Sequence, residues 1–151
     1  WGFTHTDKRF KWVPDLIGYL ARAAGNDANL LLNVGPRPAG TIQPEAVERL
    51  RAVGQWTQTY GESIYGTRKG PVPPRPWGVT TKKGDRVFVH VLDAADPSLL
   101  LQGLPSAVRS AKLMNGGAAV PFTSGAFGTV LTLPKDLDPI DTIVVLELAA
   151  R

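Results

Sequence analysis

One short apolar run limits the folds open to this chain more than any other stretch. Residues 29–36 read N-L-L-L-N-V-G-P, so three leucines lie between a polar residue and a glycine–proline turn signal. Such a run predicts a strand that is buried on both faces, which is the pattern of a parallel sheet. Groups at the carboxyl end of such a strand face the ligand site in α/β folds, and here they are Asn33, Val34 and Gly35.

Segments with a helical period flank this run on both sides. The first helix is predicted to begin at Pro14 and to end at Gly25, which we expect to adopt a positive φ. The second is predicted to begin at Pro44 and to stop at Gly61, with Trp56 as a packing anchor beside its inner face. Strand end, helix, strand and helix together resemble the closing portion of a (β/α) repeat.

Four prolines in residues 70–76 mark a domain boundary. The stretch G-P-V-P-P-R-P cannot lie inside a helix or a sheet, because proline removes a hydrogen-bond donor and fixes φ. It predicts a semi-rigid connector. We therefore divide the chain into residues 1–69, a linker at 70–76, and residues 77–151.

Short strands and turns follow the connector. Strands are expected at residues 77–81, 86–92, 107–114, 118–122, 129–133 and 142–148, with turn signals at 82–85 and 115–116. This spacing predicts a small antiparallel β-sandwich. Its aromatic residues are expected in the core: Trp77, Phe88, Phe122 and Phe127. The fold class is therefore α/β plus all-β.

The first part of the chain is too short to close a barrel, which takes eight strand–helix units. The missing units would lie before Trp1, which is not a translation start. The alternative is a compact α/β unit that packs on the sandwich.

Composition narrows the function classes. The 151 residues are 43% hydrophobic and 20% charged, which indicates a globular protein. A net charge of +4 without a dense basic stripe argues against nucleic-acid binding, and no apolar run is long enough for a membrane span. Without cysteine there is no thiolate chemistry, and no metal-ligand spacing or phosphate loop is present. His5 is expected in a solvated loop, with a position near a pocket as the alternative, because it lies near the presumed carboxyl end of a strand. His90 is expected to point outward or to make a structural hydrogen bond.

Three motifs in order resemble one enzyme family. Residues 25–36 with 40–42 are similar to G-G-N-L-L-L-N-I-G-P followed by D-G-x-I in the α-L-fucosidases of glycoside hydrolase family 29. Residues 61–67 are similar to that family's N-G-E-A-I-Y-x-T, and residues 1–3 to its W-G-Y. The tail resembles the family's C-terminal β-sandwich less sharply. Phe3 replaces a usual tyrosine, Tyr60 a usual asparagine and Thr57 a usual aliphatic residue.

The resemblance implies the last strand–helix units of a (β/α)8-type catalytic barrel, followed by an accessory sandwich. Family members are retaining enzymes with an aspartate nucleophile and a glutamate acid/base, both upstream of the W-G-Y motif. No catalytic residue is therefore assigned here, and Asp7, Asp15 and Glu45 are left without those roles. Glu62 is expected to accept backbone N–H groups at the helix exit.

The resemblance also implies partners and a compartment. It implies no cofactor or metal, a fucosylated glycan as substrate, and the rest of the barrel upstream of Trp1 as structural partner. It suggests an exported or lysosomal-type enzyme, although the sequence itself fixes no compartment.

Two residues are candidates for substrate binding. An aromatic ring complements the C5 methyl group and the apolar face of fucose, and Trp1 lies where the family has an aromatic near the pocket. A core position for Trp1 remains open. The amide of Asn33 can bond a sugar hydroxyl or a neighbouring loop. The rival hypothesis is a non-catalytic carbohydrate-binding or interaction module built on the sandwich, which would need exposed aromatics on one sheet face.

Overall fold

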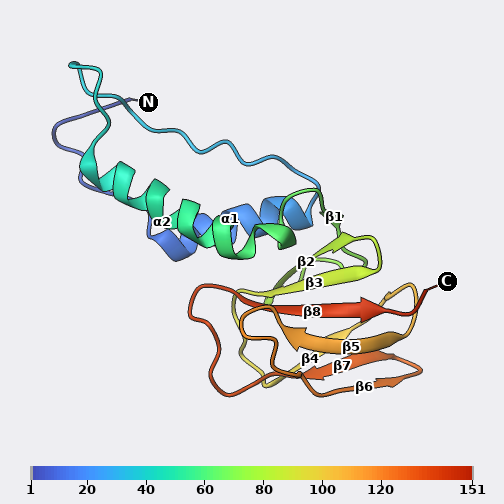
Figure 1. The fold of residues 1–151 in the computed structure, drawn as a ribbon. Coiled ribbons are helices and arrows are strands. Elements are labelled where there is room, and N and C mark those ends of the chain that lie inside the picture. Colours follow the sequence, from blue (N-terminus) through green and yellow to red (C-terminus); the bar gives the residue numbers. More distant parts are fainter. Residues whose placement is uncertain (1, 151) are drawn as a thin grey trace.

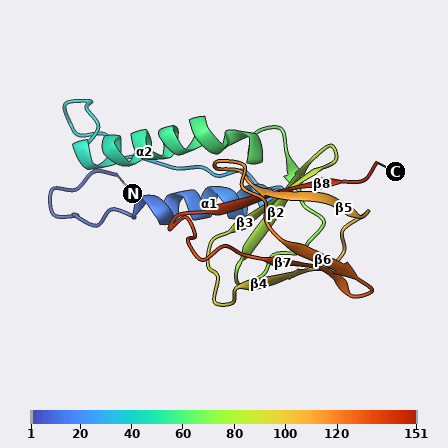
Figure 2. The same ribbon diagram turned by 60° about the horizontal axis from the view of Figure 1, so that its bottom comes forward.

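The computed structural model describes residues 2–150 and arranges them in three layers. Two helices cover one face of a five-stranded sheet, and a three-stranded sheet covers the other (Figures 1 and 2). The elements are α1 (Val13–Gly25), α2 (Pro44–Tyr60), the 3-10 turn η1 (Gly61–Ser63), β1 (Arg68–Lys69), β2 (Gly78–Lys83), β3 (Arg86–Val91), β4 (Ser98–Leu101), β5 (Val108–Leu113), β6 (Phe122–Gly125), β7 (Gly128–Thr132) and β8 (Thr142–Leu148). No helix in this part of the chain is long and apolar enough to cross a membrane.

All strand pairs are antiparallel, which confirms the predicted sandwich. The larger sheet has the order β1-β2-β3-β8-β5, and the smaller has the order β4-β7-β6. The hairpin predicted around residues 82–85 joins β2 to β3. The turn at residues 115–116 also reverses the chain, but its second arm makes only an isolated bridge at Ala119 before β6 begins. The strand predicted at residues 118–122 is wrong in its bounds, since β6 covers Phe122–Gly125, and the short strands β1 and β4 were not predicted.

The central strands are buried on both faces. In β3, Val87 and Val89 face the core between the two sheets, whereas Phe88 faces the helices and packs with Ile17 and Trp56. Because both faces are covered, β3 reads R-V-F-V-H-V without the polar alternation of a solvated sheet. The prediction of Trp56 as a packing anchor is confirmed.

One predicted core aromatic lies on the surface. Phe88 is fully buried, as expected, but the side chain of Phe127 is 83% exposed. Phe127 sits in the tight turn between β6 and β7, where a side chain has no facing layer to pack against. Its expected core position is therefore wrong.

Residues 29–36, predicted as a buried strand, form no strand in this structure. The segment runs along the two helices without a strand partner (Figure 1), and the side chain of Leu31 is 83% exposed. A strand exists only where a neighbouring chain supplies hydrogen bonds, and no described residue does so here.

The proline-rich connector packs against the sandwich. The N–H of Gly70 donates to the carbonyl of Thr80 at 2.7 Å, and the hydroxyl of Thr80 donates to the carbonyl of Val72 at 2.9 Å. The side chain of Val72 is buried, and β1, just before the connector, pairs with β2. The division at residues 69 and 77 stays a prediction.

Glu62 pairs with a side chain rather than with the backbone. Its carboxylate accepts a hydrogen bond from the guanidinium of Arg86, which also contacts Glu147 at 2.9 Å. The expected backbone N–H partners are wrong, because η1 lies beside the hairpin of β2 and β3 and brings Arg86 within reach. The pair is half exposed, so its contribution to stability is small.

A buried pair on the helix side of the sheet joins β3 to the loop before β8. Nδ1 of His90 lies 2.6 Å from a carboxylate oxygen of Asp141, and both side chains are fully buried. The hydroxyl of Thr81, 3.5 Å from Nε2 of His90, donates to the carbonyl of Ser63 at 2.6 Å. Of the two expectations for His90, the structural hydrogen bond is the one confirmed.

Gly25 ends α1 for a reason other than the predicted one. It is absent from the positive-φ residues, and Asp27 instead adopts φ 54°. A Cβ built on Gly25 would lie 2.6 Å from Cβ of Val79 in β2. The glycine is therefore required by the close approach of helix and sheet.

We predict that Gly25→Ala destabilises the protein by about 1–3 kcal/mol, because the added methyl group overlaps Val79. Urea unfolding of the 151-residue chain measures the loss. Gly18 is the matched control: it lies in the same helix with open space around it, so Gly18→Ala should raise stability by up to about 1 kcal/mol. Equal effects of the two substitutions would contradict this account.

We predict that Asp141→Ala lowers the free energy of unfolding by about 3 kcal/mol, because it leaves a buried nitrogen of His90 without its partner. The exposed Asp136 on the same loop provides the control, and Asp136→Ala should change stability by less than about 0.5 kcal/mol. Thermal and urea unfolding measure both. An Asp141 variant as stable as the control would rule out a structural role for the pair.

Candidate functional site

Two loops lie side by side at the starts of the helices. Residues 2–12 lead into α1 and residues 35–43 lead into α2 (Figure 1). A Cβ built on Gly35 would lie 2.7 Å from the backbone nitrogen of Phe3 and 2.8 Å from the carbonyl carbon of Gly2. Only glycine permits this approach, so it fixes the end of the leucine segment against the first residues of the chain.

A hollow of about 410 Å³ opens between these loops, and we call it the loop hollow. Its lining residues are Phe3, His5, Lys8, Arg37, Pro38, Ala39 and Gln43. The rings of Phe3 and His5 meet edge to face with centroids 4.8 Å apart. Lys8 and Arg37 give the hollow a positive charge, while Phe3 gives it an apolar wall.

Asp7 lies in the loop of residues 2–12, and its carboxylate contacts Arg9 of the same loop. Its carboxylate accepts the backbone N–H of Arg9 at 2.9 Å and lies 3.5 Å from the Arg9 guanidinium. The backbone N–H bond lowers the pKa of Asp7 below its ordinary value, and the guanidinium charge acts in the same direction. A carboxylate held in its ionised form is unsuited to deliver a proton.

A second hollow, of about 210 Å³, lies between the helices and the leucine segment, and we call it the helix hollow. Its lining residues are Arg9, Phe10, Lys11, Leu16, Leu32, Asn33, Val34, Ala46, Arg49 and Leu50. Among the described residues that line the two hollows there is no carboxylate.

Arg49 ties α2 to the loop before α1. Its Nε donates to the carbonyl of Lys11 and its Nη1 to the carbonyl of Glu45, both at 2.9 Å. The guanidinium also lies 5.1 Å from the ring centroid of Phe10, within cation–π range. Arg49 therefore holds residues 9–11 in place beside the helix hollow.

The described site residues predicted from the sequence do not lie together in the structure. Asn33 is exposed at the helix hollow, His5 lines the loop hollow, and Trp1 lies outside the described residues. Sequence reasoning missed Arg37 and Arg49. No sequence pattern signals the role of Arg49, because its hydrogen bonds go to the backbone carbonyls of Lys11 and Glu45 and not to side chains.

A metal centre finds no support in residues 2–150, where no group of three or more His, Cys, Asp or Glu residues is arranged to hold an ion.

Known proteins resemble the chain in its helical part and in its sheets. A family model described as alpha-L-fucosidase matches residues 1–62. An alpha-L-fucosidase from Branchiostoma floridae is 35% identical over 127 residues, which are 81% of this chain. Human plasma alpha-L-fucosidase is 31% identical over 132 residues, which are 82% of this chain. The chain belongs to the α-L-fucosidase family.

Solved α-L-fucosidase structures share the fold over almost the whole chain. Isoenzyme 1 from Paenibacillus thiaminolyticus matches with a TM-score of 0.88 at 30% identity, covering 99% of this chain and 38% of that one. The Thermotoga maritima α-fucosidase, solved in complex with a mechanism-based inhibitor, matches with a TM-score of 0.80 at 28% identity, covering 97% of this chain and 37% of that one. The chain spans about 28% of the length of the curated α-L-fucosidases named above.

We predict that Arg49→Ala lowers stability by about 1 kcal/mol, because it removes two hydrogen bonds and the contact with Phe10. It should also speed amide exchange at residues 9–11, which the guanidinium holds. Arg51, exposed on the same helix, is the control, and Arg51→Ala should change neither measurement appreciably. Matching exchange rates in the two variants would show that Arg49 does not order the loop.

Proposed function

We propose that this chain is the C-terminal portion of a retaining α-L-fucosidase, which releases terminal α-L-fucose from glycans. In this proposal residues 1–69 complete a (β/α)8-type barrel, residues 70–76 connect it to the sandwich, and residues 77–151 form the accessory domain. The proposal rests above all on the uncovered leucine segment, together with membership of the α-L-fucosidase family.

The leucine segment has the apolar sequence expected of a barrel strand, but it pairs with no described strand. Leu30, Leu31 and Leu32 are 39%, 83% and 36% exposed, although leucines in a folded domain are normally buried. Leu50, which lines the helix hollow together with Leu32, is 40% exposed. In the proposal these exposed apolar side chains belong to a surface that another part of the protein covers. Parallel strands before residue 1 would supply both that cover and the missing backbone hydrogen bonds.

The chemistry of glycoside hydrolysis also supports a catalytic acid pair outside this chain. A retaining enzyme needs two carboxyl groups about 5 Å apart across the scissile bond. The loop hollow is lined by cationic and aromatic groups instead. In the proposal both acids come from the preceding barrel, while Trp1 and Asn33 contribute to the wall of the sugar pocket.

Hydrolysis of an aryl α-L-fucoside tests the proposal. The isolated 151 residues should show no turnover above buffer, whereas the longer protein that contains them should release L-fucose with retention of anomeric configuration. Turnover by the isolated chain would contradict the proposed source of the two acids. Inversion by the longer protein would contradict the proposed mechanism.

Amide hydrogen exchange tests the observation behind the proposal. The amides of Leu30, Leu31 and Leu32 should exchange within the dead time in the isolated chain and become strongly protected in the longer protein. The amides of β3, buried in both proteins, serve as the internal control. Unprotected leucine amides in an active longer protein would show that the segment is not a barrel strand.

A further inference from the structure

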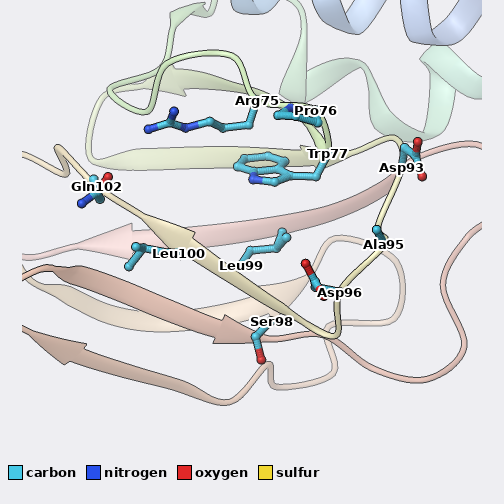
Figure 3. Close-up of a pocket in the computed structure, with 10 residues that line it drawn as sticks. All are labelled: Arg75, Pro76, Trp77, Asp93, Ala95, Asp96, Ser98, Leu99, Leu100 and Gln102. Carbon is cyan, nitrogen blue, oxygen red and sulfur yellow. The ribbon is translucent and has the colours of Figure 1, made fainter.

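A third hollow, of about 430 Å³, opens on the sandwich, and we call it the sandwich hollow (Figure 3). Its lining residues are Arg75, Pro76, Trp77, Asp93, Ala95, Asp96, Ser98, Leu99, Leu100 and Gln102. They come from the turn before β2 and from the chain between the end of β3 and the residue that follows β4. The loops that form the loop hollow lie elsewhere, beyond the far ends of the two helices (Figure 1).

The turn that carries Trp77 is held rigidly. The N–H of Arg75 donates to the carbonyl of Gly78 at 2.9 Å, and the N–H of Gly78 donates to the carbonyl of Arg75 at 3.0 Å. The carbonyl of Trp77 accepts the N–H groups of Leu92 and Asp93 at 2.8 and 3.0 Å. With proline at position 76 as well, the backbone on both sides of the indole is fixed. The wall of the hollow is therefore preformed, which lowers the entropic cost of binding.

Trp77 presents a flat apolar surface to the hollow. Its side chain is half-buried and packs against the core between the sheets. In Figure 3 the indole lies between the turn of Arg75 and Pro76 on one side and Leu99 on the other. The sequence assigned Trp77 to the core, and the structure shows it in contact with both the core and the hollow.

Four polar residues line the hollow together with Trp77. Asp93, Asp96, Ser98 and Gln102 are exposed, and none makes a side-chain hydrogen bond or ion pair within residues 2–150. With Arg75, the two aspartates give the lining a net charge of −1 (one guanidinium, two carboxylates).

We propose that the sandwich hollow binds a neutral pyranose unit of a glycan, as a second sugar site separate from the proposed catalytic pocket. The indole stacks against an apolar sugar face, while the carboxylates, the amide and the hydroxyl bond the ring hydroxyls. The volume falls within the range of small-molecule sites. The net negative charge disfavours uronic, sialic and sulfated sugars.

The same lining contains one feature of a cation cage, an aromatic ring with carboxylates nearby. Such cages surround a quaternary ammonium with several rings, whereas Trp77 is the single aromatic residue among the described lining residues. Ser98 and Gln102 offer neutral hydrogen-bonding groups that an ammonium does not need. The lining therefore favours a polyhydroxylated ligand.

Heteronuclear NMR titration of the 151-residue chain tests the proposal, with methyl galactoside, methyl fucoside, glucuronate and choline as probes. We expect a neutral glycoside to bind with a Kd of order 1 mM, with shifts at the Trp77 indole and the amides of Asp93 and Gln102. Glucuronate and choline should bind at least about tenfold more weakly.

Variants locate the site. Trp77→Ala should weaken binding at least about tenfold, while Trp12→Ala, at a tryptophan 75% exposed before α1, should leave it unchanged. Because Trp77 also packs on the core, Gln102→Ala and Asp96→Ala provide a second test at exposed positions, and each should weaken binding without altering the unfolding midpoint.

Four outcomes would overturn the proposal. The first is that no neutral glycoside shifts any resonance up to about 100 mM. The second is that binding survives both Trp77→Ala and Gln102→Ala, and the third is that choline binds but sugars do not. The fourth is that the shifts are confined to Phe3 and His5, which line the loop hollow. The test needs no hydrolysis, so its failure leaves the proposed fucosidase function untouched, and the reverse also holds.

Discussion

Burial of the central sheet on both of its faces is the constraint on which the rest of the structure depends. Val89 of β3 lies in the core between the sheets, while the adjacent Phe88 lies in the core beneath the helices. Neither face can be exposed without uncovering fully buried side chains, which costs roughly 1.5–3 kcal/mol for each large one. The helices and the sandwich are therefore one packed body, although the sequence changes character at the proline-rich connector. Ile17 and Trp56 belong to that shared core.

The positions of the two helices could be predicted from residues near their ends. Proline at the start and glycine at the end located both helices to within about a residue. The prolines act through the backbone alone, so they need no partner elsewhere in the chain. The prediction of a strand at residues 29–36 failed because a strand depends on a neighbouring strand, and no apolar pattern reveals whether that neighbour is present. Gly25 was correctly expected at a helix end, but its cause is the contact with Val79, which lies far along the chain.

The candidate site was less accessible to sequence reasoning. The loop hollow joins Phe3 to Arg37, and the sandwich hollow joins Trp77 to Gln102, so spacing along the chain signals neither. The family motifs include Phe3 of the loop hollow but not Lys8 or Arg37, which also line it. Trp77 shows the difficulty most clearly, because a tryptophan at a strand start reads as core until the turn beside it is known.

The uncovered leucine segment has a consequence for the handling of the isolated chain. Leu31 and its neighbours combine apolar side chains with backbone N–H and carbonyl groups that no described strand engages. Such an edge can template pairing with the same edge of a second molecule, which is how open strands seed aggregation. Aggregation of the isolated chain in concentrated solution is therefore expected to begin at this segment. Leu31→Lys would place a charge in the segment and so oppose such pairing.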